Sequence, residues 1–251
     1  MHNEAYGPSE KRHMDLPEAE LPETESPESE SPVAGQGSRD DGSRKDRQRA
    51  VSGHRRSLIL DAAKEVFQES GLDGANVREI AKRAGYTPGA IYFYFRSKEE
   101  IYGALLADSL ERLNVAVSCA GKNTRSRRAK LLAKATAFFA FYSENPRDLD
   151  LGFYLFHGMK PHGLTPELNE QLNTRLRDAL VPTEAVLLEM GVAPAAALRE
   201  VTALFGHCVG LLLLQHTGRI KMFEQDAAQL FKDYVEQLYK RRGDSDAKHS
   251  G

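Results

Sequence analysis

The sequence has few cysteines and no long hydrophobic run. Its 251 residues include only two cysteines, Cys119 and Cys208, which lie far apart and lack the spacing of metal ligands. This pattern argues against a disulfide framework and suits a reducing cytoplasm. The longest apolar run, residues 209–214, is far too short to span a bilayer, and no apolar core of a signal peptide lies near Met1. We therefore expect a cytoplasmic protein with no membrane partner.

Sequence motifs of enzymes and metal sites are also missing. There is no glycine-rich phosphate loop, no nucleophile elbow and no conspicuous pair of carboxylates. Cys208 lies among apolar residues, which indicates an inert core residue rather than a redox sensor. We expect no catalytic residue, no metal and no cofactor. The histidines and the cysteine that could in principle bind a metal do not have the spacing of a metal site. These residues are His157, His162, His207, Cys208 and His216.

Alternating patterns of β-strands are absent, and the turns carry the residues of helix caps. The chain from Ser97 onward reads as helices only, so the sequence predicts an all-α fold. Pro182 should kink the helix that contains it. The helices expected in this larger domain, residues 98–251, cover residues 98–120, 126–144, 146–156, 165–190, 194–217 and 223–241.

The formal net charge of -2 hides an uneven distribution. Residues 14–31 contain six glutamates and neither lysine nor arginine, and a basic stretch follows them. Because residues 1–46 are rich in Glu, Pro, Ser and Gly, they cannot bury enough apolar surface to fold, and we expect a disordered tail. The tail is either plain solvated chain or a modulator whose acidic part competes with phosphate for the basic part. The basic arm comprises Arg44, Lys45, Arg47, Arg49, Arg55 and Arg56.

A small three-helix domain is expected at residues 47–97. Its first helix, residues 47–70, has apolar residues at the spacing of one buried face, and Gly71 ends it. The second helix begins at a capping box formed by Asn76 and Glu79, and Gly85 ends it in the left-handed conformation that glycine adopts without strain. A glycine turn between two short helices is the pattern of a helix-turn-helix, whose second helix enters the DNA major groove.

The third helix of this domain has residues suited to DNA. Thr87 caps it and supplies a hydroxyl, Pro88 takes its first position, and Gly89 permits a close approach of the nucleic-acid backbone. Ile91 and Phe95 are expected in the core, which turns Tyr92 and Phe93 outward, while Tyr94 could face either way. The residues predicted to bind DNA are Arg78, Thr87, Pro88, Gly89, Tyr92, Phe93, Tyr94 and Lys98.

Residues 59–101 resemble the DNA-binding domain of the TetR family of bacterial transcriptional repressors. The resemblance rests on three stretches in order and at the right spacing: ILDAAKEVFQESG, VREIAKRAG and YTPGAIYFYFRSKEEI. It implies that Thr87, Pro88, Gly89, Tyr92 and Phe93 face DNA and that Lys98 binds phosphate. The all-helical remainder fits the ligand-binding and dimerisation domain of that family by architecture only.

Two positions depart from what many members of this family carry. Val77 stands where threonine is common, which removes a phosphate-binding hydroxyl. Phe93 stands where histidine is common, which leaves stacking or contact with a methyl group. Affinity should therefore depend more on Arg78 and on the basic arm, which we expect to reach an adjacent minor groove or the DNA backbone.

The resemblance implies a homodimeric repressor that binds a palindromic double-stranded operator in a bacterial cytoplasm and leaves it when a small molecule binds. Two alternatives stay open: a helical regulator that responds to a protein partner, and a helical scaffold or enzyme with a vestigial helix-turn-helix. Aromatic residues concentrated in two consecutive helices are either plain core or the effector pocket. The predicted pocket comprises Phe138, Phe139, Tyr142, Arg147, Phe153, Tyr154 and His157.

The last two helices are the expected dimer interface. The penultimate helix is apolar nearly all round, and its two glycines, one turn apart, would let a second helix approach closely. The other interpretation is that both helices only close the core of the monomer. The predicted interface residues are Gly206, Gly210, Leu213, Leu230, Tyr234 and Leu238.

Overall fold

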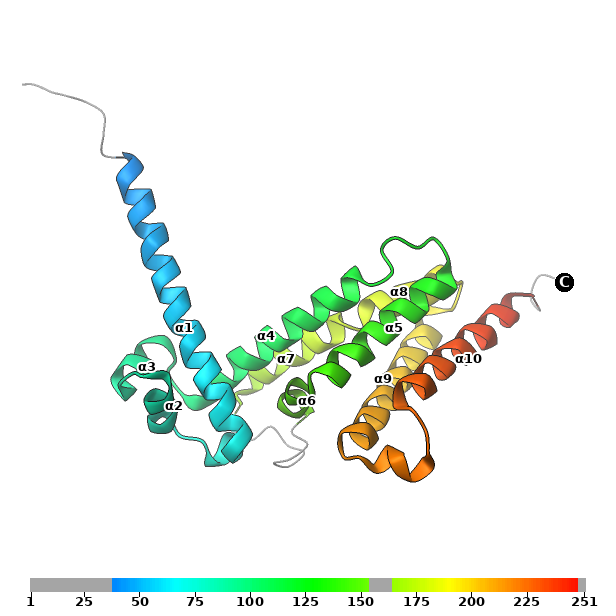
Figure 1. Cartoon of the computed structure of the whole chain (residues 1–251). Helices are drawn as coiled ribbons and strands as arrows, with labels where there is room; N and C mark the ends of the chain where they lie inside the picture. The colour runs from blue at the N-terminus through cyan, green and yellow to red at the C-terminus, as the bar shows by residue number, and fades with distance from the viewer. Residues whose placement is uncertain (1–37, 154–163, 248–251) are drawn as a thin grey trace, which may run out of the picture. The chain divides into compact units, whose positions relative to one another are not determined.

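A computed structural model of the chain describes the backbone of residues 38–153 and 164–247 and the side chains of residues 44–153 and 164–242. Within these residues every regular element is a helix, which confirms the predicted all-α fold (Figure 1). The chain divides into two compact units, residues 1–46 and 47–251. Of the first unit, only the helical residues from Ser38 to Asp46 are described. The predicted division of the second unit at Ser97 stays a prediction.

The first helix begins earlier than its sequence pattern predicts. Helix α1 spans Ser38–Gly74, so residues 38–46, assigned above to a disordered tail, are helical. This stretch contains no proline, the residue that most strongly excludes a helix. The expected stop is confirmed, because Gly71 leaves the helical conformation with φ 67° and a short turn follows it. The basic arm is therefore a helical segment and not an extended one.

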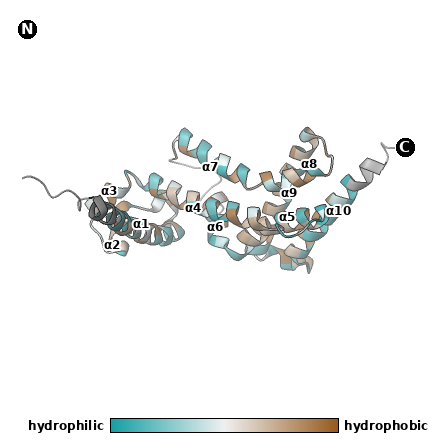
Figure 2. Ribbon diagram, turned by 90° about the horizontal axis from the view of Figure 1, so that it is seen from above, coloured by the Kyte–Doolittle hydropathy of each residue, from teal (hydrophilic) through white to brown (hydrophobic). Residues whose placement is uncertain are grey.

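Helices α2 (Val77–Ala84) and α3 (Pro88–Tyr94) pack on α1, and α4 (Lys98–Cys119) continues from them into the larger domain. There, α5 (Arg127–Glu144) contacts α4, α6 (Pro146–Phe153), α8 (Val181–Glu189), α9 (Pro194–His216) and α10 (Ala227–Ala247). Helix α7 (Pro166–Asp178) lies along α4. Hydrophobic and hydrophilic residues interleave along the helices in Figure 2, as expected for helices that each bury one face.

Two predicted helices of the larger domain are wrong in extent. The helix expected over residues 165–190 is two helices, α7 and α8, separated by Ala179 and Leu180, which keep right-handed helical dihedral angles, and Pro182 lies in the first turn of α8. Proline is tolerated there since the first turn needs no N–H partner. The last helix begins at Ala227 and not at Phe223, since Asp226 accepts from the Gln229 N–H at 2.7 Å. Phe223 ends a separate 3-10 turn, η1 (Arg219–Phe223).

Candidate nucleic-acid interface

Local hydrogen bonds build the turn between α2 and α3. The Asn76 carboxamide oxygen accepts from the Glu79 N–H at 2.9 Å and caps α2. Gly85 ends α2 in the left-handed region at φ 73°. The Thr87 hydroxyl oxygen accepts from the Ala90 N–H at 3.3 Å, and Pro88 opens α3. These caps, all predicted from the sequence, fix the direction in which α3 leaves the turn.

A small core holds the two helices against α1. Ile80 on α2 and Ile91 on α3 are fully buried, and they belong to one core with the buried Ile59 and Phe67 of α1. At the edge of this core, the Arg83 guanidinium donates to both carboxylate oxygens of Glu69 at 2.8 and 2.9 Å. This ion pair raises the pKa of Arg83 and lowers the pKa of Glu69. The helix-turn-helix is thus a rigid support, as a recognition surface requires.

Opposite the core, α3 presents aromatic side chains to solvent. Phe93 is 81% exposed and Tyr92 is 54% exposed, while Ile91 and Phe95 are buried, as predicted. Tyr94 is half-buried, and its ring meets the Phe93 ring edge to face at 5.2 Å between centroids. Large exposed apolar groups on a rigid surface mark a binding site. The predicted DNA-facing residues Thr87, Pro88 and Gly89 are exposed beside these rings, as is Arg78 on α2.

Lys98 has a structural contact that the sequence did not indicate. Its ammonium donates to the carbonyl oxygens of Asp73 at 3.0 Å and Ala75 at 3.1 Å. These carbonyls belong to the turn between α1 and α2, so Lys98 fastens the start of α4 to that turn. An ammonium has three donors, and two serve the fold. The phosphate contact of Lys98 therefore stays a prediction for the third donor.

The basic arm lies on the surface of α1. In the second unit, Arg47, Arg49, Arg55 and Arg56 are exposed, and the Arg56 guanidinium lies 4.9 Å from the centroid of the Phe95 ring. In the first unit, Arg44 and Lys45 are exposed as well. The arm therefore offers charge for a DNA backbone from one helix, and Arg56 is anchored next to the recognition helix.

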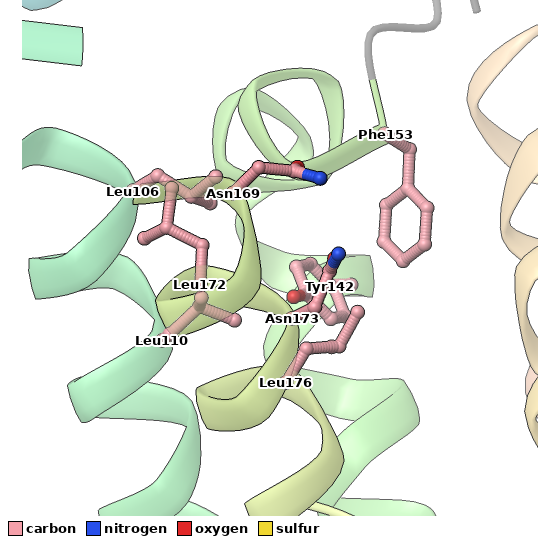
Figure 3. Close-up of a pocket in the computed structure, with 9 residues that line it drawn as sticks. Leu106, Leu110, Tyr142, Phe153, Asn169, Leu172, Asn173 and Leu176 are labelled. Atoms are coloured by element: carbon pink, nitrogen blue, oxygen red, sulfur yellow. The ribbon is translucent and has the colours of Figure 1, made fainter. Parts of the chain in front are cut away.

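Only some of the residues predicted to form the effector pocket lie around one cavity. A cavity of about 40 Å³ lies between α4, α5, α6 and α7 (Figure 3). Tyr142 and Phe153 line it, as predicted, and burial raises the pKa of Tyr142. The remaining lining residues were not predicted, and they are Leu106, Leu110, Gly152, Asn169, Leu172, Asn173 and Leu176. The four-residue spacing of the two asparagines on one helix face is the signal that the sequence offered.

Other predicted pocket residues lie elsewhere. Phe138 packs edge to face against Phe205 at 5.8 Å, and Phe139 stacks on Phe231 at 5.0 Å. Both are core residues, because neither lines the cavity and both are buried. Arg147 is exposed and does not line the cavity either. Tyr154 and His157 lie outside the described residues.

Helix α6 contacts both α4 and α1. The Tyr102 hydroxyl on α4 donates to the Leu151 carbonyl of α6 at 2.5 Å, and the Tyr102 ring lies edge to face with Phe67 of α1 at 5.4 Å. The buried Asp148 carboxylate of α6 accepts from Arg112 of α4 at 2.9 Å and lies 3.8 Å from the ammonium of Lys64 on α1. Helix α6 is therefore linked to α4 and, through the contact of Asp148 with Lys64, to α1.

The face of α9 that carries Gly206 and Gly210 is open. A Cβ atom at either glycine would meet nothing within 4 Å, and Leu198 and Leu213 are exposed along the same helix. Leu230 and Tyr234 are half-buried, and Tyr234 stacks on His207 at 4.3 Å. Leu238 is different, because it is fully buried in the core of the monomer and presents no surface to a second copy.

Two further features of α9 bear on the predictions. Among the described helices, α9 alone is long and apolar enough to cross a membrane by length and composition, and 33% of its most apolar window is buried. Core helices of soluble proteins pass the same test. Cys208 on this helix is buried, and burial raises the pKa of its thiol, as expected for an inert core residue. In the described part of the chain, no three His, Cys, Asp or Glu residues are grouped as a metal would need.

Comparisons with known proteins agree with this geometry. Residues 59–105 match the family of bacterial regulatory proteins described as the tetR family. The chain is 37% identical over 99 residues to the transcriptional activator FasR of Mycolicibacterium smegmatis, which is 39% of this chain and 45% of that protein. It is 33% identical over 104 residues to the uncharacterized transcriptional regulator YdgC of Bacillus subtilis, covering 40% and 53%. The chain spans about half the length of these curated relatives.

Solved structures extend the likeness in fold to about three quarters of the chain. The putative regulatory protein SCO4313 matches with a TM-score of 0.62 at 21% identity, over 74% of this chain and 97% of that one. The TetR-family regulator PfmR of Thermus thermophilus matches with a TM-score of 0.54 at 20% identity, over 72% and 97%. At this identity the likeness speaks for the fold. Residues 59–105 are therefore a DNA-binding domain of the kind found in bacterial regulatory proteins of the tetR family, and the described chain shares the fold of a solved TetR-family regulator.

Proposed function

We propose that this chain binds a palindromic DNA operator as a homodimer and represses transcription until a small molecule binds its larger domain. The observation that carries DNA binding is the exposed face of α3, where Tyr92 and Phe93 stand on a helix whose other face is locked in the core. Exposed arginines of α1 and Arg78 supply charge for phosphates.

The first test is binding to the DNA upstream of the gene that encodes the chain. We expect a duplex from that region to be bound with sequence preference and with an affinity that falls steeply as salt rises. Substituting Arg78→Gln should weaken binding to specific and random DNA alike, since a phosphate contact carries no sequence information. A chain that binds neither duplex at low salt would favour a vestigial helix-turn-helix.

A homodimer is supported by the open face of α9. Two copies that pack there would bury Leu198 and Leu213, and the missing side chains of Gly206 and Gly210 would let the helices approach closely. A twofold dimer also matches the two half-sites of a palindrome. Leu213→Glu should yield monomers by sedimentation, whereas Val115→Glu, which replaces an exposed apolar residue of α4, should leave the dimer intact. A wild-type monomer at micromolar concentration contradicts the proposal.

Release by a small molecule is supported by the cavity between α4, α5, α6 and α7, whose lining combines apolar side chains with Asn169 and Asn173. At about 40 Å³ it has room for roughly three water molecules, whereas ligand pockets measure about 300–1,000 Å³. An effector must therefore enlarge it. At Gly103 of α4, a Cβ atom would come within 2.6 Å of Leu168 Cδ2 of α7, so the Leu168 side chain packs directly on α4 at this glycine. A ligand that separates α6 and α7 would move α4, which continues into the DNA-binding domain.

The small cavity is also the observation that favours the alternative, a regulator that responds to a protein partner. Thermal-shift screening with hydrophobic metabolites separates the two, because an effector must bind one conformation more tightly than the other and so stabilise it. A compound that raises Tm and weakens operator binding supports the small-molecule proposal. Repression and activation are distinguished by a reporter gene with the chain present and absent, since a known relative is an activator.

A further inference from the structure

The outermost ridge of α3 consists of Gly89 and Phe93. An α-helix advances about 100° per residue, so residues four apart share a face. Ile91, between them in sequence, is fully buried and defines the inner face. Gly89 and Phe93 lie on the opposite side, whereas Tyr92 lies toward one flank. The part of α3 that stands farthest from the core therefore has no hydrogen-bonding side chain.

Phe93 serves no packing role within the described chain that would explain its type. Its side chain is 81% exposed, and its ring meets the Tyr94 ring edge to face at 5.2 Å and 82°. That contact orients the ring without covering its outer surface. Leaving a phenyl ring in water forgoes about 1.5–3 kcal/mol of burial free energy. A partner outside the chain is the gain that would offset this cost.

Gly89 lacks a side chain for no internal reason. It is not among the glycines with positive φ, so any residue could adopt its backbone conformation. A Cβ atom there would meet only the Thr87 hydroxyl oxygen, at 4.0 Å, which is ordinary contact. Alanine also has a higher intrinsic helix propensity than glycine. The missing methyl leaves the exposed face of α3 open at Gly89, one turn before Phe93.

These observations define what the ridge can recognise. In the major groove, thymine alone among the four bases presents a methyl group, and the other groups on the base edges are hydrogen-bond donors and acceptors. A ridge of Gly89 and Phe93 offers neither donor nor acceptor from its side chains. We propose that Phe93 reads the C5-methyl group of a thymine in each half-site and that Gly89 allows α3 to approach closely enough for this contact. The inference rests on the proposed DNA binding.

The test removes the methyl group alone. An operator is first selected from random duplexes with the purified full-length protein, and each thymine is then replaced in turn by deoxyuridine. One buried methyl is worth about 0.8 kcal/mol, so we expect about a fourfold loss of affinity at one thymine, and about a fifteenfold loss when both symmetric thymines are replaced. In Phe93→Ala the same replacement should have no effect, while in Tyr92→Phe it should keep its full effect.

Folding controls are simple because both side chains are exposed. Phe93→Ala and Gly89→Ala should leave Tm unchanged or slightly raised, and both should bind the operator more weakly than the wild type. Selection that enriches no sequence contradicts DNA recognition as a whole. An enriched operator in which no thymine is sensitive to deoxyuridine, or in which the sensitivity persists in Phe93→Ala, overturns the methyl contact and leaves DNA binding standing.

Discussion

The buried carboxylate of Asp148 gives the sharpest prediction about how α6 is held against α4. Asp148→Asn keeps the shape of the side chain, and the acceptor of the Arg112 hydrogen bond becomes a neutral amide oxygen in place of a charged carboxylate. Hydrogen bonds to charged groups contribute about 1.5–3 kcal/mol and neutral ones about 0.5–1.5 kcal/mol. The lost attraction to Lys64 adds little, since the side chains of Lys64 and Arg112 are 33% and 43% exposed and solvent screens them. We therefore expect a loss of about 1–2 kcal/mol in unfolding free energy.

Urea denaturation followed by circular dichroism measures this loss, and Tm should fall by roughly 2–8 °C for a domain of this size. Asp108→Asn is the matched control, because Asp108 also accepts from Arg112, at 3.2 Å, but is 66% exposed. Its loss should stay near 0.5 kcal/mol. A double-mutant cycle with Arg112→Gln should give a coupling energy of about 1 kcal/mol for Asp148. Equal losses at both aspartates, or no coupling, would refute the reasoning.

Three further predictions concern single side chains. Lys98→Met should lower the free energy of unfolding by about 1–2 kcal/mol, because two backbone carbonyls lose their donor. If stability is unchanged and DNA binding depends less steeply on salt, Lys98 serves only to bind a phosphate. Burial lowers the pKa of His207 from its ordinary value of 6.5. The unfolded chain therefore takes up the proton first, and the free energy of unfolding decreases as pH falls below about 6.5. In urea titrations between pH 7 and 5, His207→Phe should make the free energy of unfolding depend less on pH, and an unchanged dependence contradicts the prediction. Iodoacetamide should modify Cys119 in the native protein and Cys208 only after unfolding, which mass spectrometry distinguishes; equal native labelling would show that α9 opens.

The helix ends of the DNA-binding domain were predictable because the groups that fix them lie within four residues of one another. Asn76 with Glu79, and Thr87 with Ala90, form hydrogen bonds that the sequence alone implies. The break near Pro182 was read wrongly because proline suits both a kink and the first turn of a new helix. Only the packing of the chain at Ala179 decides between them.

The site was predictable where one short helix carries it and not where distant helices meet. The exposed face of α3 follows from the positions of Ile91 and Phe95. The carbonyls that Lys98 holds are 23 and 25 residues away, and Asn169 reaches the cavity only because α7 lies along α4. Such contacts depend on how helices pack, which hydrophobic periodicity does not specify.

Sequence-specific DNA binding is tested most directly by fluorescence anisotropy of a labelled duplex from the DNA upstream of the gene, against a scrambled duplex of the same composition. At physiological salt we expect the upstream duplex to bind at least about a thousandfold more tightly than the scrambled one, with two chains per operator. Equal affinity for the two duplexes would contradict the recognition role assigned to α3.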